Sequence, residues 1–63
     1  MSRDTAPRPL VTILDDEPEI RSMLSDTLEE AGFDTLSFGR ARAFEAALAN
    51  HTPDVCLVDL SLP

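Results

Sequence analysis

The sequence predicts an α/β fold in which strands and helices alternate and the strands form one parallel sheet. Three strand-like runs, at 10–14, 34–38 and 54–59, are separated by two segments with a helical spacing of apolar residues. The first and third runs are apolar and β-branched, which is typical of strands covered on both faces. Alternating units of this kind are joined by right-handed crossovers. The expected order is therefore β-α-β-α-β, in a 63-residue chain that holds one domain at most.

The segment after the first strand predicts an amphipathic helix. Pro18 follows the acidic run Asp15-Asp16-Glu17, and proline is well placed in the first turn of a helix. Gly32 provides a C-terminal stop. The residues that recur at spacings of three and four, and so form one stripe, are Ile20, Met23, Leu24, Thr27, Leu28 and Ala31.

A second helix is expected in the alanine-rich segment 41–50. Gly39 allows a turn before it, and the start of the helix has no strong side-chain cap. A polar loop then leads to the strand 54–59, which is apolar until it ends in the carboxylate of Asp59.

Several single residues have a simple structural interpretation. Cys56 cannot form an internal disulfide because it is the one cysteine, and it is expected as a small buried hydrophobe. Arg40 and Arg42 are interpreted as part of a solvated face. The aromatic residues expected in the core are Phe33, Phe38 and Phe44.

Composition and charge exclude several classes of protein. The chain is 43% hydrophobic and 27% charged, as in soluble globular proteins. Twelve acidic against five basic residues give a formal charge of −7, which argues against direct nucleic-acid binding. No stretch is long and apolar enough to span a membrane. Residues 1–9 lack the apolar core of a signal peptide, and we expect them to be a disordered leader of a cytoplasmic protein.

Three carboxylates are expected to form one site. Asp15 and Asp16 follow the first strand, and Asp59 ends the third. Functional groups of a doubly wound sheet gather beyond the carboxyl ends of its strands. Neighbouring strands lie about 4.8 Å apart, so side chains at two such ends can meet. Carboxylates this close repel one another and need a cation, and hard oxygen ligands favour Mg²⁺.

A carboxylate beside a bound Mg²⁺ is suited to phosphoryl transfer. The metal offsets charge on the phosphoryl oxygens, while Asp59 supplies the attacking oxygen. No general base is needed, because a carboxylate is already ionised at neutral pH.

Each acidic group also has a simpler interpretation. An acidic run before a helix usually serves N-terminal capping and compensation of the helix dipole. An aspartate at the end of a strand is usually a turn residue. The combination is more specific than its parts, because capping alone does not predict an acid at the end of the third strand.

Two segments resemble bacterial response regulator receiver domains, the CheY-like family: LVTILDDEPEIRSML, from Leu10, and PDVCLVDLSLP, which ends at Pro63. In the second, an aspartate ends the third strand of the family and a proline follows in the next loop. The resemblance covers residues 10–63 and implies the N-terminal half of a receiver. The implied fold is a partial flavodoxin-like, doubly wound parallel sheet with strand order 2-1-3.

The resemblance also implies a role in two-component signalling. The protein would be a phosphoacceptor and not an enzyme. Asp59 would receive the phosphoryl group from a sensor histidine kinase or a phosphotransfer protein. Asp16 would bind Mg²⁺ directly and Asp15 directly or through water. Asp59 and the backbone carbonyl of Ser61 would complete the ligands from the protein. The family's threonine or serine after its fourth strand, and its lysine after the fifth, would follow Pro63.

The same residues admit comparison with three other classes of function. A non-phosphorylated module would use this fold only to dimerise or dock. A Mg²⁺-dependent phosphohydrolase usually carries its aspartyl nucleophile in Asp-x-Asp after the first strand, whereas the two acids here are adjacent. A dinucleotide-binding domain is disfavoured, because no glycine-rich turn follows the first strand.

The third strand is expected to have an open edge in this chain, since the family places a fourth strand beside it. An apolar, unpaired edge at 55–58 invites pairing with another chain. Self-association through this edge is therefore expected.

Overall fold

The computed structural model describes residues 8–59 and confirms the alternating order of elements. The elements are β1 (Leu10–Leu14), α1 (Pro18–Glu30), β2 (Asp34–Phe38), α2 (Ala41–Leu48) and β3 (Val55–Val58). The helix α2 ends earlier than predicted, because the amides of Ala49 and Asn50 donate to carbonyls only three residues back, at 3.2 and 3.0 Å. Such bonds close the helix in a tight last turn.

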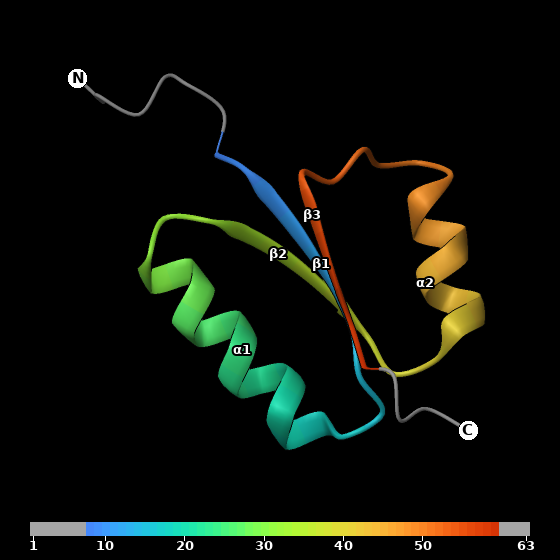
Figure 1. The fold of residues 1–63 in the computed structure, drawn as a ribbon, viewed down its shortest axis with the longest axis horizontal. Coiled ribbons are helices and arrows are strands. Elements are labelled where there is room, and N and C mark those ends of the chain that lie inside the picture. The colour runs from blue at the N-terminus through green and yellow to red at the C-terminus, as the bar shows by residue number, and fades with distance from the viewer. Residues whose placement is uncertain (1–7, 60–63) are drawn as a thin grey trace.

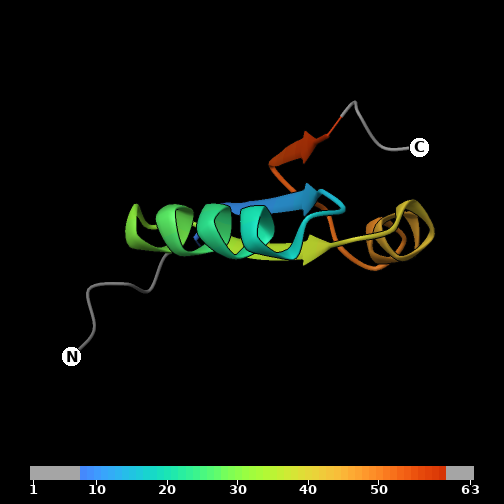
Figure 2. The same ribbon diagram turned by 90° about the horizontal axis from the view of Figure 1, so that it is seen from below.

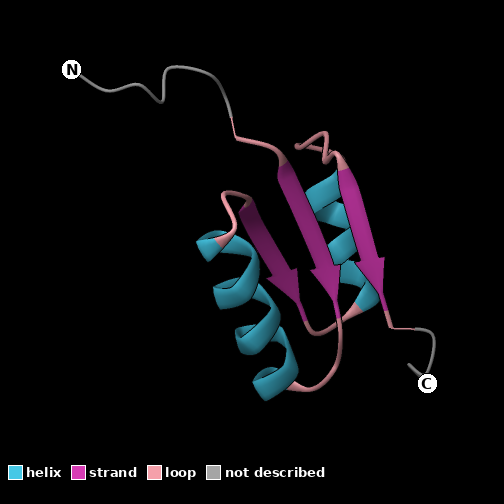
Figure 3. Ribbon diagram, turned by 60° about the vertical axis from the view of Figure 1, so that its left-hand side comes forward, coloured by secondary structure: helices cyan, strands magenta, loops and turns pink. Residues whose placement is uncertain are grey.

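The sheet has the order β2-β1-β3, and β1 pairs in parallel with both neighbours (Figure 3). Val11 of β1 lies opposite Thr35 of β2 and Val55 of β3. The three strands therefore end on the same side, which Figure 2 shows from below. This is the parallel, 2-1-3 arrangement that the resemblance implies.

The two helices lie on opposite faces of the sheet (Figure 1). The helix α1 packs mainly on β2, and α2 packs on β1 and β2. This placement follows from right-handed crossovers on either side of the central strand. Neither helix is long and apolar enough to cross a membrane.

The core is centred on β1, which in the sheet formed by residues 8–59 has a neighbour on each side. Its apolar members Val11, Ile13 and Leu14 are at most 5% exposed, and the hydroxyl-bearing Thr12 is fully covered. Phe44 of α2 is the other buried residue within 8–59. A small sheet of this kind thus buries one strand and one aromatic ring.

The predicted apolar stripe of α1 is only partly covered. No residue of α1 is buried, and Met23 is 53% exposed. The half-covered members of the stripe are Ile20, Leu24 and Leu28. The reason is that α1 packs mainly on the edge strand β2, so little of the sheet lies beneath it.

The expectation that Cys56 is buried is wrong. Cys56 is exposed, as are the other residues of β3. Among the described elements, β3 pairs with β1 but gains no substantial cover from either helix. Of the three phenylalanines expected in the core, Phe44 is buried and Phe33 and Phe38 are half-buried. The rings of Phe38 and Phe44 meet edge to face, with centroids 6.3 Å apart.

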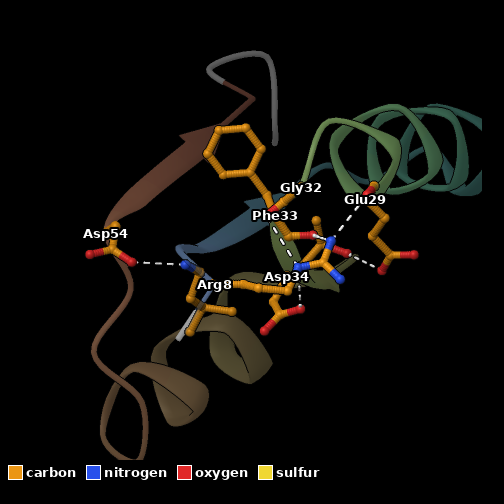
Figure 4. Close-up of polar contacts among 8 residues, drawn as sticks. Arg8, Glu29, Gly32, Phe33, Asp34 and Asp54 are labelled. Atoms are coloured by element: carbon orange, nitrogen blue, oxygen red, sulfur yellow. Dashed lines mark hydrogen bonds and ion pairs between the residues drawn. The ribbon is translucent and has the colours of Figure 1, made fainter. Parts of the chain in front are cut away.

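Polar contacts fasten the end of the sheet at which the strands begin (Figure 4). The Arg8 guanidinium donates to the carbonyls of Gly32 (3.1 Å), Glu29 (3.1 Å) and Phe33 (3.2 Å), and it pairs with Asp34 at 3.5 Å. These carbonyls belong to the C-terminal turn of α1 and the loop after it, where helix carbonyls lack intrahelical partners. Gly32 has a φ of 103°, as the predicted stop requires.

A second contact joins β1 to β3 at the same end. The amide of Leu10 donates to the Asp54 carboxylate at 2.8 Å, and the amide of Asp54 donates to the Leu10 carbonyl at 2.8 Å. Arg8 and Pro9, which the sequence placed in a leader, are themselves bonded to the fold: Arg8 through its guanidinium, and Pro9 through its carbonyl, which accepts the amide of Asp34 at 2.9 Å. The rest of that expectation, residues 1–7, lies outside the described residues.

Candidate metal centre

The opposite end of the sheet brings the predicted acids together. Leu14 and Val58 are partners in register, so the residues that follow them leave the sheet side by side. The amide of Asp59 donates to the carbonyl of Leu14 at 2.9 Å, and the amide of Asp15 donates to that of Phe38 at 3.0 Å. These two bonds extend the hydrogen bonding between β1 and its neighbours past the strand ends. They hold the backbone of Asp15 and of Asp59.

The carboxylates of Asp15, Asp16 and Asp59 form one cluster. One oxygen from each lies within 4.8 Å of the others. Asp15 and Asp59 are half-buried, whereas Asp16 is exposed. Three of the four residues proposed as metal ligands are thus neighbours, and the fourth, Ser61, lies outside the described residues.

The loop between β1 and α1 is shaped by Asp15. Its Oδ1 accepts the amide of Glu17 at 2.9 Å, and its carbonyl accepts Nη1 of Arg21 at 2.8 Å. The N-cap of α1 is Glu17, whose side chain makes no capping hydrogen bond. The Asp15 carboxylate thus bonds to an amide that precedes the first turn of α1. This contact is an Asx turn, a structural role that Asp15 has besides its place in the acid cluster.

The donor set fits a hard divalent cation. Three carboxylates at this separation repel one another, and a cation between them offsets the repulsion. Two oxygens on opposite sides of one Mg²⁺ lie about 4.2 Å apart, since each is about 2.1 Å from the ion. A separation of up to 4.8 Å is close enough for small side-chain rotations to bring all three oxygens to one ion.

Apolar side chains lie below the acid cluster. A hollow with Asp15 and Asp59 at its wall is lined by residues of β1, α1 and β3, among them Ile13, Leu24 and Leu57. Apolar surroundings strengthen electrostatic interactions by lowering the local dielectric constant. The half-buried acids therefore interact more strongly with a cation than fully solvated ones would.

Sequence reasoning missed Arg21 and the second role of Gly39. The helical period places Arg21 off the apolar stripe. It does not indicate that the Arg21 side chain reaches back to the loop before α1. A Cβ on Gly39 would lie 2.6 Å from Nη1 of Arg21, so the glycine makes room for the guanidinium. An arginine one turn after an acidic loop, with a glycine after the next strand, is the pattern that could have indicated this contact.

Known proteins contain segments that are similar in sequence to this chain. The family model for the response regulator receiver domain matches residues 11–63. The chain is 39% identical over 56 residues to the DNA-binding transcriptional regulator NtrC of Salmonella typhimurium. It is 41% identical over 51 residues to the response regulator protein PilR of Pseudomonas aeruginosa, and 37% over 54 residues to the transcriptional regulatory protein KdpE of Mycobacterium tuberculosis.

These matches cover most of the chain but little of the relatives. They include 89% of the chain for NtrC, 81% for PilR and 86% for KdpE, but only 12%, 12% and 24% of those proteins. No solved structure gives a significant match. The parallel β2-β1-β3 sheet, the helices on both faces and the family match agree with one another. The chain therefore belongs to the response regulator receiver family, as the N-terminal portion of a receiver domain.

Proposed function

We propose that this segment carries the phosphoacceptor site of a two-component signalling protein, with Asp59 as the residue that is phosphorylated. The observation that carries the proposal is the cluster of three carboxylates, within 4.8 Å of one another, at the carboxyl end of the sheet. Receiver domains are phosphoacceptor modules of response regulators, and the chain belongs to their family. The donor would be a sensor histidine kinase or a phosphotransfer protein.

The position of Asp59 suits the acceptor role. Its backbone is held by the bond from its amide to Leu14, and its side chain is half-buried beside Asp15. An oxygen of the ionised carboxylate forms a bond to phosphorus while the bond from phosphorus to the donor atom breaks. The leaving group takes the electron pair of that bond, and the product is a mixed anhydride on Asp59.

Asp15, Asp16 and Asp59 would hold Mg²⁺, with the carbonyl of Ser61 as a further ligand by resemblance to the family. When bound, the ion would offset charge on the phosphoryl oxygens. Asp15 contributes through a side chain already fixed by the amide of Glu17. A carboxylate has two oxygens, so this hydrogen bond leaves capacity for a cation.

The output of the whole protein would lie outside this segment. Relatives named as transcriptional regulators are four to eight times longer than the matched part, and the formal charge of −7 does not suit DNA contact here. We propose that the segment acts in the cytoplasm and that phosphorylation of Asp59 changes its contacts with another part of the protein.

One observation favours a second candidate, a docking or dimerisation module that is not phosphorylated. The residues of β3 are all exposed, with Val55 and Val58 at 47% and 46%. An apolar edge of this kind can pair with another strand. Phosphorylation at Asp59 distinguishes the two candidates.

The test is incubation of the complete receiver that carries this segment with acetyl phosphate and Mg²⁺. Mass spectrometry should show the addition of one phosphoryl group, which Asp59→Asn abolishes. Asp54→Asn is the matched control, because Asp54 flanks the opposite end of β3 and asparagine can still accept the amide of Leu10. No mass increase, or an increase that persists in Asp59→Asn, would contradict the proposal.

A further inference from the structure

The few basic residues of this acidic chain are unevenly distributed. All five are arginines, and three of them, Arg21, Arg40 and Arg42, line one surface hollow. We call these three the arginine hollow. Asp16, a member of the acid cluster, also lines it, together with Pro18 and Gly39. The loop before α1 and the turn before α2 meet at this end of the sheet (Figure 1).

Arg21 is fixed in the hollow. Its Nη1 donates to the carbonyl of Asp15 at 2.8 Å, and its guanidinium occupies the space that a side chain at position 39 would fill. A guanidinium carries five N–H donors in a planar fork. The bond to the Asp15 carbonyl therefore holds the group in place and leaves most of its donors for another acceptor.

Arg40 and Arg42 stand at the start of α2 and are exposed. Within residues 8–59, no ion pair or side-chain hydrogen bond involves either of them. Arg8 differs, because its guanidinium is bonded to three carbonyls at the other end of the sheet and paired with Asp34. Among residues 8–59, the guanidinium groups other than that of Arg8 are thus gathered beside the acid cluster.

We propose that the arginine hollow docks a carboxylate-bearing surface of the protein that donates the phosphoryl group. The identity of this partner as the donor rests on the proposed function. The contact itself rests on charge complementarity, because the rest of the chain is strongly acidic and repels an acidic partner. Within residues 8–59, an acidic partner surface is therefore attracted to the arginine hollow, next to Asp16, and this contact orients it toward the acceptor site.

Exposure of the hollow favours a protein partner over a free small anion. Exposed ion pairs contribute little singly, so an isolated anion gains little affinity from them. A partner that also meets the acid cluster adds these contacts to an existing interface, where rim charges mainly set the association rate and its salt dependence. The hollow would thus contribute orientation and rate of encounter rather than affinity alone.

The test uses the full chain, labelled with ¹⁵N, and octaglutamate as an acidic probe at low salt. The side-chain Nε signals of Arg21, Arg40 and Arg42 should shift on titration, while the signal of Arg8 stays in place. The double variant Arg40→Gln/Arg42→Gln should bind octaglutamate about fivefold more weakly, as expected for the loss of two exposed ion pairs. Both positions are exposed, so the amide spectrum should show that the fold is kept.

Three results would overturn the proposal: no shift at the hollow, an equal shift at Arg8, or saturation of the same signals by inorganic phosphate at the same concentration. A neutral peptide of alternating serine and glycine is the matched control for the probe. Titration of the same sample with Mg²⁺ reports separately on the amides of Asp15, Asp16 and Asp59. Loss of the Mg²⁺ response alone would count against the proposed function and leave the acidic contact standing.

Discussion

At the scale of single residues, Asp15 does more than supply a charge. Its amide bonds to β2, its carboxylate to the amide of Glu17 and its carbonyl to Arg21. The same residue therefore fixes the loop, orients the start of α1 and lies in the acid cluster. Its membership of the cluster was predictable from its place after an apolar strand. Its bond to Arg21 was not, because helical spacing gives no information on how far a long side chain turns back.

The two glycines provide a contrast at this scale. Gly32 has a φ of 103° and open space around it, whereas Gly39 has Arg21 at the position of a Cβ. Gly32→Ala should lower the free energy of unfolding by about 1 kcal/mol, because an L-residue is strained at that φ. Gly39→Ala should cost less than about 1 kcal/mol, since the flexible arginine can move at the loss of one hydrogen bond. Urea unfolding of both variants tests this, and an equal or larger loss in Gly39→Ala would contradict it.

Arg8 provides a second prediction for a single side chain. Arg8→Ala removes three hydrogen bonds to carbonyls and an ion pair, all of them exposed. The expected loss in the free energy of unfolding is about 1 kcal/mol, because exposed polar contacts are weak. Arg42→Ala, which removes an exposed arginine whose side chain forms no hydrogen bond or ion pair within residues 8–59, should leave stability nearly unchanged. Equal urea midpoints for the two variants would show that the Arg8 contacts do not stabilise the fold.

At the scale of elements, the strands β1 and β2 and the start of α1 were predictable, because proline and apolar periodicity mark them locally. The start of α2 was less so, since no side-chain cap marks it. Burial was less predictable. The runs 10–14 and 54–59 look alike in sequence, yet β1 is buried and β3 is exposed. The difference depends on which neighbours cover each strand, and this information is not in the run itself. The exposed Cys56 and the partly covered stripe of α1 have the same cause.

The edge of β3 gives the prediction at this scale. The chain of residues 1–63 should self-associate with rising concentration, because β3 carries exposed apolar residues and, among residues 8–59, pairs with β1 alone. Val55→Lys should reduce this association, since a charged edge residue opposes pairing with another strand. Ser37→Lys, with the same charge on an exposed position of β2, is the control and should have little effect. Sedimentation that shows a monomer at every concentration would exclude association through β3.

At the scale of the whole molecule, the sheet separates two polar ends. The bonds of Arg8 and Asp54 fasten the end at which the strands begin, and the acid cluster and the arginine hollow occupy the end at which they finish. The acid cluster was predictable because parallel strands bring their carboxyl ends together. The hollow was not predictable, since Arg21 is brought to Arg40 and Arg42 by the paths of two loops and by the space at Gly39.

The central claim is that Asp15, Asp16 and Asp59 form one cation site. Its most direct test is a titration of the ¹⁵N-labelled chain with Mn²⁺, a paramagnetic substitute for Mg²⁺ that also prefers oxygen ligands. The amide signals of these three residues should broaden first, excess Mg²⁺ should reverse the effect, and Asp16→Asn should weaken it while Glu30→Gln does not. Broadening that is equally strong at Glu29 and Glu30, or broadening that is unchanged in Asp16→Asn, would contradict the claim.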